Sequence, residues 1–131
     1  MTLKTLDFPK IEDPRGNLTF FQFPQQIPFK IERTFWTYDV PGGEIRGGHA
    51  YKIQEEIIIA LSGSFDLVIT NKNGKQERFH LKSPNQGIYL PPNTWRHLEN
   101  FSTNSFSLHL SNMSYSESDY IRNLNEYLEI K

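Results

Sequence analysis

The sequence contains no cysteine, so it can form no disulfide, as is usual for proteins of a reducing cytoplasm. Its 14 basic and 15 acidic residues nearly cancel, and no overall charge favours a nucleic acid or a membrane surface. No stretch approaches the roughly 20 apolar residues of a membrane span, and the N-terminal segment lacks the apolar run of a signal peptide. We therefore expect a soluble, cytoplasmic protein whose partners include no nucleic acid and no membrane.

The length predicts a single domain, residues 1–131, able to bury a core without disulfides or metals. Short aromatic and β-branched segments recur between eight glycines and eight prolines, a spacing typical of an all-β sandwich or barrel. Turn signals lie at Asp13–Gly16 and at Asn73-Gly74. The predicted strands include residues 3–8, 18–23, 31–38, 65–70, 76–81, 87–90, 95–101 and 105–110.

Alternation divides residues 31–38 between two strand faces. One face carries Arg33, Phe35 and Thr37, and the other carries Thr34, Trp36 and Tyr38. The tail alone has a helical pattern, behind Ser116 as a candidate N-cap. The residues at helix spacing are Tyr120, Ile121, Leu124, Tyr127 and Leu128. These patterns predict an all-β fold with a short C-terminal helix.

The stretch from Pro41 to Phe65 is the richest in chemistry. A glycine-rich turn delivers residues that bind or move charge: Arg46, His49, Tyr51 and Lys52. Because side chains two apart on a strand point the same way, His49 and Tyr51 share a face. An almost wholly apolar strand follows and ends at a Ser-Gly-Ser turn. We interpret this stretch as the active-site strand pair of a small β-barrel enzyme.

Two segments resemble the sequence motifs of the cupins. The places of the first motif are filled by Gly43, His49, Tyr51, Glu56 and Gly63, with tyrosine where the motif has its second histidine. The second motif matches loosely at Gly87, Pro92, His97 and Asn100. The resemblance implies a double-stranded β-helix, or jelly roll, that encloses a ligand pocket.

A longer ordered set of segments resembles the cupin 3,4-ketoisomerases that act on dTDP-4-keto-6-deoxyglucose, also called WxcM-like. The segments are Asp13-Pro14-Arg15-Gly16, residues 46–52, Leu61-Ser62-Gly63-Ser64, residues 83–89, residues 92–96, Asn100-Phe101-Ser102 and residues 115–122. The resemblance implies an enzyme without metal or cofactor that makes 3-keto sugars for amino-deoxysugar and surface polysaccharide biosynthesis. It also implies a homodimer in which N-terminal strands are exchanged.

The reaction moves a ketone from C4 to C3 of the sugar through an enediol. Histidine suits this chemistry because it accepts and donates protons near neutral pH, so His49 is the candidate proton shuttle. Tyr51 stands where the family has a second catalytic histidine, and its hydroxyl would donate a hydrogen bond to the developing enediolate. Two alternatives stay open. One is a non-catalytic dTDP-sugar-binding cupin that lost the reaction with the second histidine. The other is a 3,5-epimerase, which shares fold and substrate but uses a His–Asp base in a longer chain.

The substrate carries a pyrophosphate, which guanidinium groups bind well because they present a planar fork of hydrogen-bond donors. Arg15, Arg33 and Arg46 are the expected pyrophosphate ligands, and Lys52 is a further substrate-binding residue. The resemblance places Arg96 near the sugar, where it would fix the face of C4 protonation. Aromatic candidates for stacking on thymine or sugar are Tyr89 and Trp95, for which core packing is the competing role.

A metal site is the remaining alternative for this stretch. His49, Glu56 and His97 fill three of the four cupin ligand places, and two histidines with one carboxylate can hold iron or manganese. Tyr51 replaces the fourth ligand, and the family resembled here uses no metal, so we expect none. His80 and His109 have no partner that the sequence reveals and are expected to be solvated or structural.

Overall fold

The computed structural model describes residues 1–130, and most of its elements are short strands. One sheet is built from β1 (Lys4–Asp7), β4 (Arg33–Tyr38), β6 (Glu56–Ser62), β9 (Gln86–Leu90) and β11 (Phe106–Ser111). The other contains β5 (Arg46–Tyr51), β7 (Phe65–Thr70), β8 (Gln76–Leu81), β10 (Trp95–Glu99) and β12 (Tyr120–Ile121). A separate hairpin joins β2 (Lys10–Ile11) to β3 (Leu18–Thr19), and the tail forms a 3₁₀ turn (Glu117–Asp119) and helix α1 (Leu124–Glu129).

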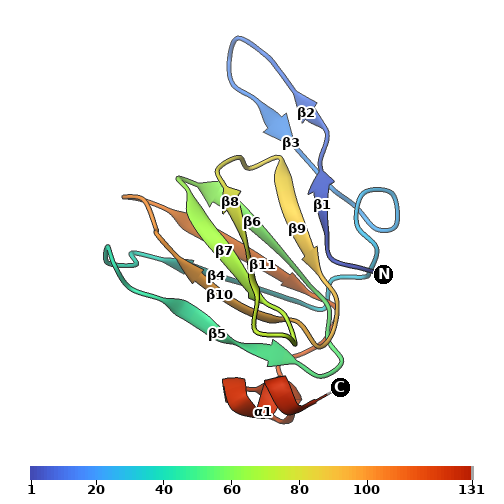
Figure 1. Ribbon diagram of the computed structural model, residues 1–131. Helices are drawn as coiled ribbons and strands as arrows, with labels where there is room; N and C mark the ends of the chain where they lie inside the picture. Colours follow the sequence, from blue (N-terminus) through green and yellow to red (C-terminus); the bar gives the residue numbers. More distant parts are fainter. Residues whose placement is uncertain (131) are drawn as a thin grey trace.

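Both five-stranded sheets are antiparallel, and they lie face to face (Figure 1). Their strand orders are β1-β9-β6-β11-β4 and β12-β5-β10-β7-β8, so neighbouring strands come from distant parts of the chain. This interleaving is the pattern of a jelly roll. The prediction of an all-β cupin fold with a short C-terminal helix is confirmed.

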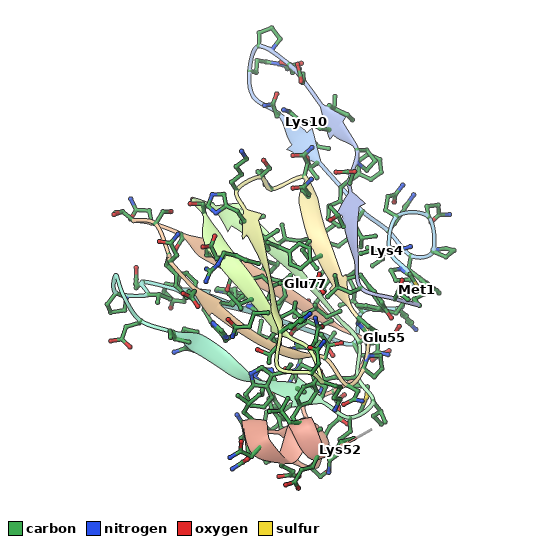
Figure 2. All side chains as sticks on the ribbon, viewed as in Figure 1. Met1, Lys4, Lys10, Lys52, Glu55 and Glu77 are labelled. Carbon is green, nitrogen blue, oxygen red and sulfur yellow. The ribbon has the colours of Figure 1, made fainter. Side chains whose placement is uncertain are left out.

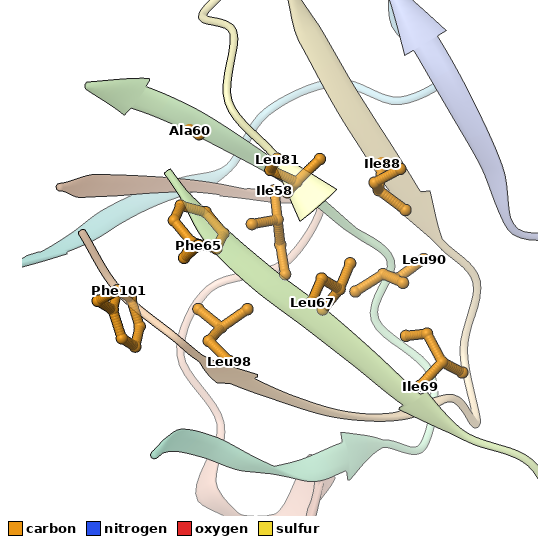
Figure 3. Close-up of a cluster of buried hydrophobic side chains, with 10 residues drawn as sticks. All are labelled: Ile58, Ala60, Phe65, Leu67, Ile69, Leu81, Ile88, Leu90, Leu98 and Phe101. Atoms are coloured by element: carbon orange, nitrogen blue, oxygen red, sulfur yellow. The ribbon is translucent and has the colours of Figure 1, made fainter. Parts of the chain in front are cut away.

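The main core fills part of the space between the sheets (Figure 3). Its buried residues are Ile58, Ala60, Phe65, Leu67, Ile69, Leu81, Ile88, Leu90, Leu98 and Phe101. Strand β6 is buried on both faces, because Ile58 and Ala60 face this core while Ile57 and Ile59 pack under the N-terminal segment with Phe8. Two-sided burial accounts for the almost wholly apolar sequence of this strand.

The alternation predicted for residues 31–38 is confirmed in β4. Its residues alternate between half-buried and exposed, with Arg33, Phe35 and Thr37 on the half-buried side. The strand pairs with β11 at the edge of its sheet. The inward face of β4 can therefore reach the space between the sheets.

The tail departs from the helix predicted behind Ser116. Ser116 makes no side-chain cap bond, and Tyr120 and Ile121 pair as strand β12 with Tyr51 and Ala50 of β5. The α-helix begins only at Leu124, after Asn123 accepts a hydrogen bond from the Glu126 amide at 3.0 Å. Strand pairing thus overrides the helical spacing, and it fixes Tyr120 beside β5.

The β2–β3 hairpin projects from the body of the molecule, as the position of Lys10 shows (Figures 1 and 2). The turn predicted at Asp13–Gly16 is confirmed by a 2.9 Å hydrogen bond from the Gly16 amide to the Asp13 carbonyl. The strand predicted over residues 18–23 is shorter, since only Leu18 and Thr19 pair. In residues 1–130, no helix has the length and apolar character needed to cross a membrane.

Candidate active site

A cavity of about 240 Å³ lies between the sheets, beside the apolar core. It is lined from both sides by β4, β5, β6, β10, β11 and β12. The lining residues are Phe35, Thr37, Arg46, Gly47, His49, Glu56, Ile58, Arg96, Leu98, His109, Tyr120 and Arg122. Its volume is below the roughly 300–1,000 Å³ of sites for drug-sized ligands, so it suits one ring-sized group.

A bulge in β5 shapes one wall of this cavity. Arg96 of β10 lies opposite His49, whereas Leu98 lies opposite Arg46. Three steps along β5 therefore match two along β10, which leaves one extra residue in β5. Gly47 has φ of 75°, a conformation that glycine adopts without strain. This local geometry brings both Arg46 and His49 onto the cavity wall.

The cavity contains a buried ion pair. Arg96 Nη1 donates to Glu56 Oε1 at 2.5 Å, and each side chain is 2% exposed. Arg96 Nε also donates to the Thr94 carbonyl at 3.0 Å. Burial alone would raise the pKa of Glu56, but the Arg96 charge and His109 outweigh it and lower that pKa to about 2. Glu56 is therefore a carboxylate at neutral pH.

His109 reaches the same ion pair from β11. Its Nδ1 lies 3.4 Å from Glu56 Oε2, and its Nε2 lies 2.9 Å from Ser107 Oγ. Ser107 is hydrogen-bonded in turn to Thr37. Phe35 stacks on the imidazole with 4.5 Å between ring centroids and 8° between planes. These contacts fix the orientation of the ring.

His49 lies in an aromatic setting on the opposite sheet. Its ring centroid is 4.7 Å from that of Tyr51 and 5.0 Å from that of Tyr120. Burial, followed by the positive charge of Arg96, lowers the pKa of His49 to about 3. The imidazole is therefore neutral at physiological pH.

Tyr51 supports the site from behind and does not line the cavity. Its buried hydroxyl accepts a hydrogen bond from Arg33 at 3.4 Å and donates one to the Tyr120 hydroxyl at 3.2 Å. Burial, followed by the Glu56 carboxylate, raises the pKa of Tyr51 far above its usual value. The Arg96 guanidinium lies 4.9 Å from the centroid of its ring. Tyr51 therefore stays a neutral phenol that positions its neighbours.

The basic residues expected to bind substrate divide into two groups. Arg46 and Arg96 line the cavity, Arg46 as an exposed side chain and Arg96 as a buried one. Arg33 is held away from the cavity lining, where its Nη2 donates to Gln54 Oε1 at 3.2 Å. Arg15 lies in the projecting β2–β3 hairpin and pairs with Asp13 at 2.9 Å. The structure therefore does not assemble the three expected pyrophosphate ligands within one chain.

Lys52, Tyr89 and Trp95 also lie outside the cavity lining. Lys52 is exposed just after β5, at the end of the molecule that carries α1 (Figure 2). Tyr89 is buried on the outer face of its sheet, and its hydroxyl donates to Glu55. Trp95 packs under α1, with its ring centroid 5.7 Å from that of Tyr127. For the two aromatic residues, packing is the role that the structure supports.

The three candidate metal ligands do not converge. His97 follows Arg96 on β10 and so faces the other side of the sheet, where its Nε2 lies 2.5 Å from Glu99 Oε1. Glu56 is occupied by Arg96. Across residues 1–130, no cluster of three or more histidine, cysteine or acidic side chains is arranged to hold a metal ion.

Sequence reasoning missed three ionisable cavity residues: His109, Tyr120 and Arg122. His109, expected to be solvated or structural, is 6% exposed and lines the cavity. The alternation of Ser107, His109 and Ser111 with two leucines would have placed it on the inward face of β11. Tyr120 was assigned to a helix and instead borders His49 from β12. His80 also has a partner outside the cavity, since its Nδ1 lies 2.7 Å from Asp66 Oδ1.

Several polar atoms of the cavity residues lack partners. Five buried side-chain nitrogen or oxygen atoms have no hydrogen-bond partner among residues 1–130. Four belong to residues that line the cavity: His49 Nε2, Arg96 Nη2, and Glu56 Oε2 with His109 Nδ1, which face each other at 3.4 Å. Because unpaired buried polar groups are costly, their gathering around one cavity indicates a site for a polar ligand.

Comparison with known proteins places this geometry in context. A family model described as "FdtA: WxcM-like, C-terminal" matches residues 1–131. The TDP-4-oxo-6-deoxy-alpha-D-glucose-3,4-oxoisomerase of Aneurinibacillus thermoaerophilus is 35% identical over 127 residues, which covers 97% of this chain and 91% of that protein.

Solved structures of the same kind superpose closely. A 3,4-ketoisomerase from Helicobacter canadensis matches with a TM-score of 0.94 and 35% identity, over 99% of this chain and 97% of that one. A histidine-to-asparagine variant of the 3,4-ketoisomerase QdtA from Thermoanaerobacterium thermosaccharolyticum, in complex with TDP-4-keto-6-deoxyglucose, matches with a TM-score of 0.94 and 29% identity. That match covers 98% of this chain and 92% of the other.

Proposed function

The chain belongs to the WxcM-like family of sugar 3,4-ketoisomerases, and from this premise we propose that it converts dTDP-4-keto-6-deoxyglucose to a dTDP-3-keto-6-deoxyhexose. The observation that carries the proposal is the set of unpaired polar atoms around the cavity. The keto sugar carries hydroxyl groups at C2 and C3 and a carbonyl oxygen at C4. Such a ring satisfies buried donors and acceptors on both walls at once.

His49 is the proposed base. The reaction begins when a base removes the proton from C3, and His49 presents a neutral imidazole with an unpaired Nε2 in the cavity. The electrons of the C3–H bond form the C3–C4 double bond, and the C4 carbonyl oxygen becomes an enediolate oxygen. A histidine in this role contributes about 10²- to 10⁴-fold to the rate.

Arg96 is the proposed stabiliser of the enediolate. Its Nη1 and Nε are engaged by Glu56 and the Thr94 carbonyl, but its buried Nη2 is unpaired. A fixed cation next to developing negative charge lowers the barrier without reorganisation. Tyr51, which the sequence analysis cast as the hydrogen-bond donor to the enediolate, is proposed here to hold His49 and Arg96 in position.

The nucleotide would lie outside the cavity, because 240 Å³ suits the sugar ring and not the whole dTDP-sugar. Arg46 is exposed on the cavity lining and makes no ion pair with any residue from 1 to 130. Arg46 is therefore the proposed pyrophosphate ligand of this chain. Arg122 lies nearby, but Glu117 binds it through two hydrogen bonds of 2.7 and 2.9 Å.

Arg15 is proposed to act only in a homodimer with exchanged N-terminal segments. The hairpin that carries it projects from the body and exposes Ile11 and Leu18, each 55% accessible. Apolar side chains on a projecting two-stranded hairpin gain stability when a second subunit covers them. The proposed setting is the cytoplasm, where the enzyme would take part in making amino-deoxysugars for surface polysaccharides.

The test compares wild-type protein with His49→Asn. We expect wild type to convert dTDP-4-keto-6-deoxyglucose to the 3-keto sugar, and His49→Asn to bind TDP normally while losing conversion by about 10²-fold or more. Proton NMR follows conversion, and calorimetry measures binding. Isomerisation that survives the change would remove His49 from its role, whereas wild type that binds the substrate without changing it would support the non-catalytic alternative.

A further inference from the structure

The cavity holds two histidines on opposite walls, and the proposed mechanism uses only one. His49 comes from β5 of one sheet, and His109 comes from β11 of the other. Both side chains line the same cavity, so the two rings face one space from opposite sheets. A sugar ring bound between the sheets therefore has an imidazole on each side.

The surroundings of His109 suit a proton donor. A carboxylate near an imidazole stabilises a proton on the ring, and Glu56 Oε2 lies 3.4 Å from His109 Nδ1. Ser107 holds Nε2, and the stacked ring of Phe35 restricts rotation. Nδ1 itself is buried and has no hydrogen-bond partner in residues 1–130. The ring is thus held in one orientation, with Nε2 on Ser107 and Nδ1 turned toward the Glu56 carboxylate at the cavity.

The other charged groups that face His109 do not take its place. Arg96 is paired with Glu56 and, as a guanidinium, does not release its proton at neutral pH. Tyr51 lies behind the cavity lining with its hydroxyl engaged by Arg33 and Tyr120. A buried phenol whose pKa is raised is a poor proton donor. His109 is the cavity histidine that the proposed mechanism leaves without a role.

We propose that His109, supported by Glu56, is a second catalytic residue that delivers the proton to C4 while His49 removes the proton from C3. This inference rests on the proposed ketoisomerase function. In the first step the C3–H bond breaks, its proton goes to His49, and its electron pair forms the C3–C4 double bond as the C4 carbonyl becomes an enediolate. In the second step the C3 hydroxyl loses its proton, the C3 carbonyl forms, and the electrons of the double bond take a proton from His109 to make the C4–H bond.

The proton count closes over the cycle. At the end of the second step His49 has gained one proton and His109 has lost one. The enediolate oxygen at C4 is neutralised by the proton of the C3 hydroxyl or by a proton from solvent. When product leaves, exchange with water returns His49 to its neutral form and restores the proton of His109. No oxidant, reductant or metal is consumed.

The experiment separates the two histidines by isotope exchange in deuterated buffer, with dTDP-4-keto-6-deoxyglucose as the probe. His109→Asn is expected to lower formation of the 3-keto sugar by about 10²- to 10⁴-fold while deuterium still enters C3 of the substrate, because His49 still forms the enediol. His49→Asn is expected to lose both the exchange and the product. His80→Asn is the matched control, since that histidine pairs with Asp66 outside the cavity and should leave both signals at wild-type levels.

The outcomes distinguish this inference from the proposed function. Product formation within about threefold of wild type in His109→Asn would overturn the inference alone. So would loss of C3 exchange to the level of His49→Asn in a variant that still binds TDP, because His109 would then act in the first step or merely hold the site together. If His109→Asn fails to bind TDP, His109→Gln serves for the same comparison. Wild type that neither exchanges nor isomerises would overturn the function and this inference together.

Discussion

The space between the two sheets has a polar half and an apolar half, and the same strands build both. Strand β6 contributes Glu56 to the cavity and Ala60 to the core. Strand β10 contributes Arg96 to the cavity. The apolar half is closed by packed side chains, whereas the polar half contains a cavity bordered by unpaired polar atoms. The comparison shows that strand alternation decides which residues point inward. The chemistry of those residues then decides whether the space is filled by packed side chains or left as a cavity for a ligand.

The largest expected difference between the halves concerns the buried ion pair. Glu56→Gln leaves the Arg96 charge buried without a carboxylate, and breaking such a pair costs about 3–5 kcal/mol. We expect urea unfolding to show this loss, together with weakened isomerisation. The double variant Glu56→Gln/Arg96→Met should recover part of the stability but not the activity, because no uncompensated charge remains. A single variant as stable as wild type would contradict a pair buried in the native state.

The second expected difference is a pH dependence that belongs to the polar half. Burial and Arg96 lower the pKa of His49 to about 3 in the folded protein, against about 6.5 when unfolded. Between these values the unfolded chain binds more protons, so the free energy of unfolding falls as the pH falls from 6.5 toward 3. The slope approaches about 1.4 kcal/mol per pH unit where His49 alone titrates.

Glu56 adds to this loss at lower pH. Its folded pKa of about 2 lies below the usual value of 4.5, so the stability that it contributes is present above pH 4.5 and lost as the pH falls toward 2. Urea unfolding of His49→Asn from pH 7 to pH 4.5 should show a shallower slope than wild type. An unchanged slope in that variant would mean that His49 is not buried in its neutral form.

The smallest expected effect is in the apolar half. Ile88→Val removes one methylene from a side chain that is 2% exposed in the core and lies outside the cavity lining, which costs about 0.5–1.5 kcal/mol. Isomerisation and the slope of stability with pH should stay at wild-type values. Steady-state kinetics and unfolding at two pH values check this. A large loss of activity would show that the two halves are mechanically coupled.

The sequence predicted the fold well where a local pattern determines the structure. Alternation in β4 identified the face that carries Phe35 and Thr37, and the turn at Asp13–Gly16 formed as expected. The prediction failed for Tyr120. Helical spacing cannot reveal that this residue pairs with Tyr51, which lies 69 positions earlier in the sequence. Long-range pairing overrides a local pattern that is compatible with more than one structure.

The site was predicted in part for the same reason. His49 lies in a short motif, and the structure places it on the cavity wall together with Arg96. His109 has no motif around it, and its approach to Glu56 depends on the pairing of β11 with β6, which the sequence does not show. Tyr89 has the chemistry of a stacking residue, but its strand face points it into a second core.

The most direct test of the account is proton NMR of wild-type protein with dTDP-4-keto-6-deoxyglucose in deuterated buffer. The account predicts that the 3-keto sugar appears with deuterium at C4, because the proton delivered there comes from a side chain that exchanges with solvent. A substrate that stays bound but unchanged, with no deuterium at C3 or C4, would contradict the central claim that the polar half of this space is a ketoisomerase active site.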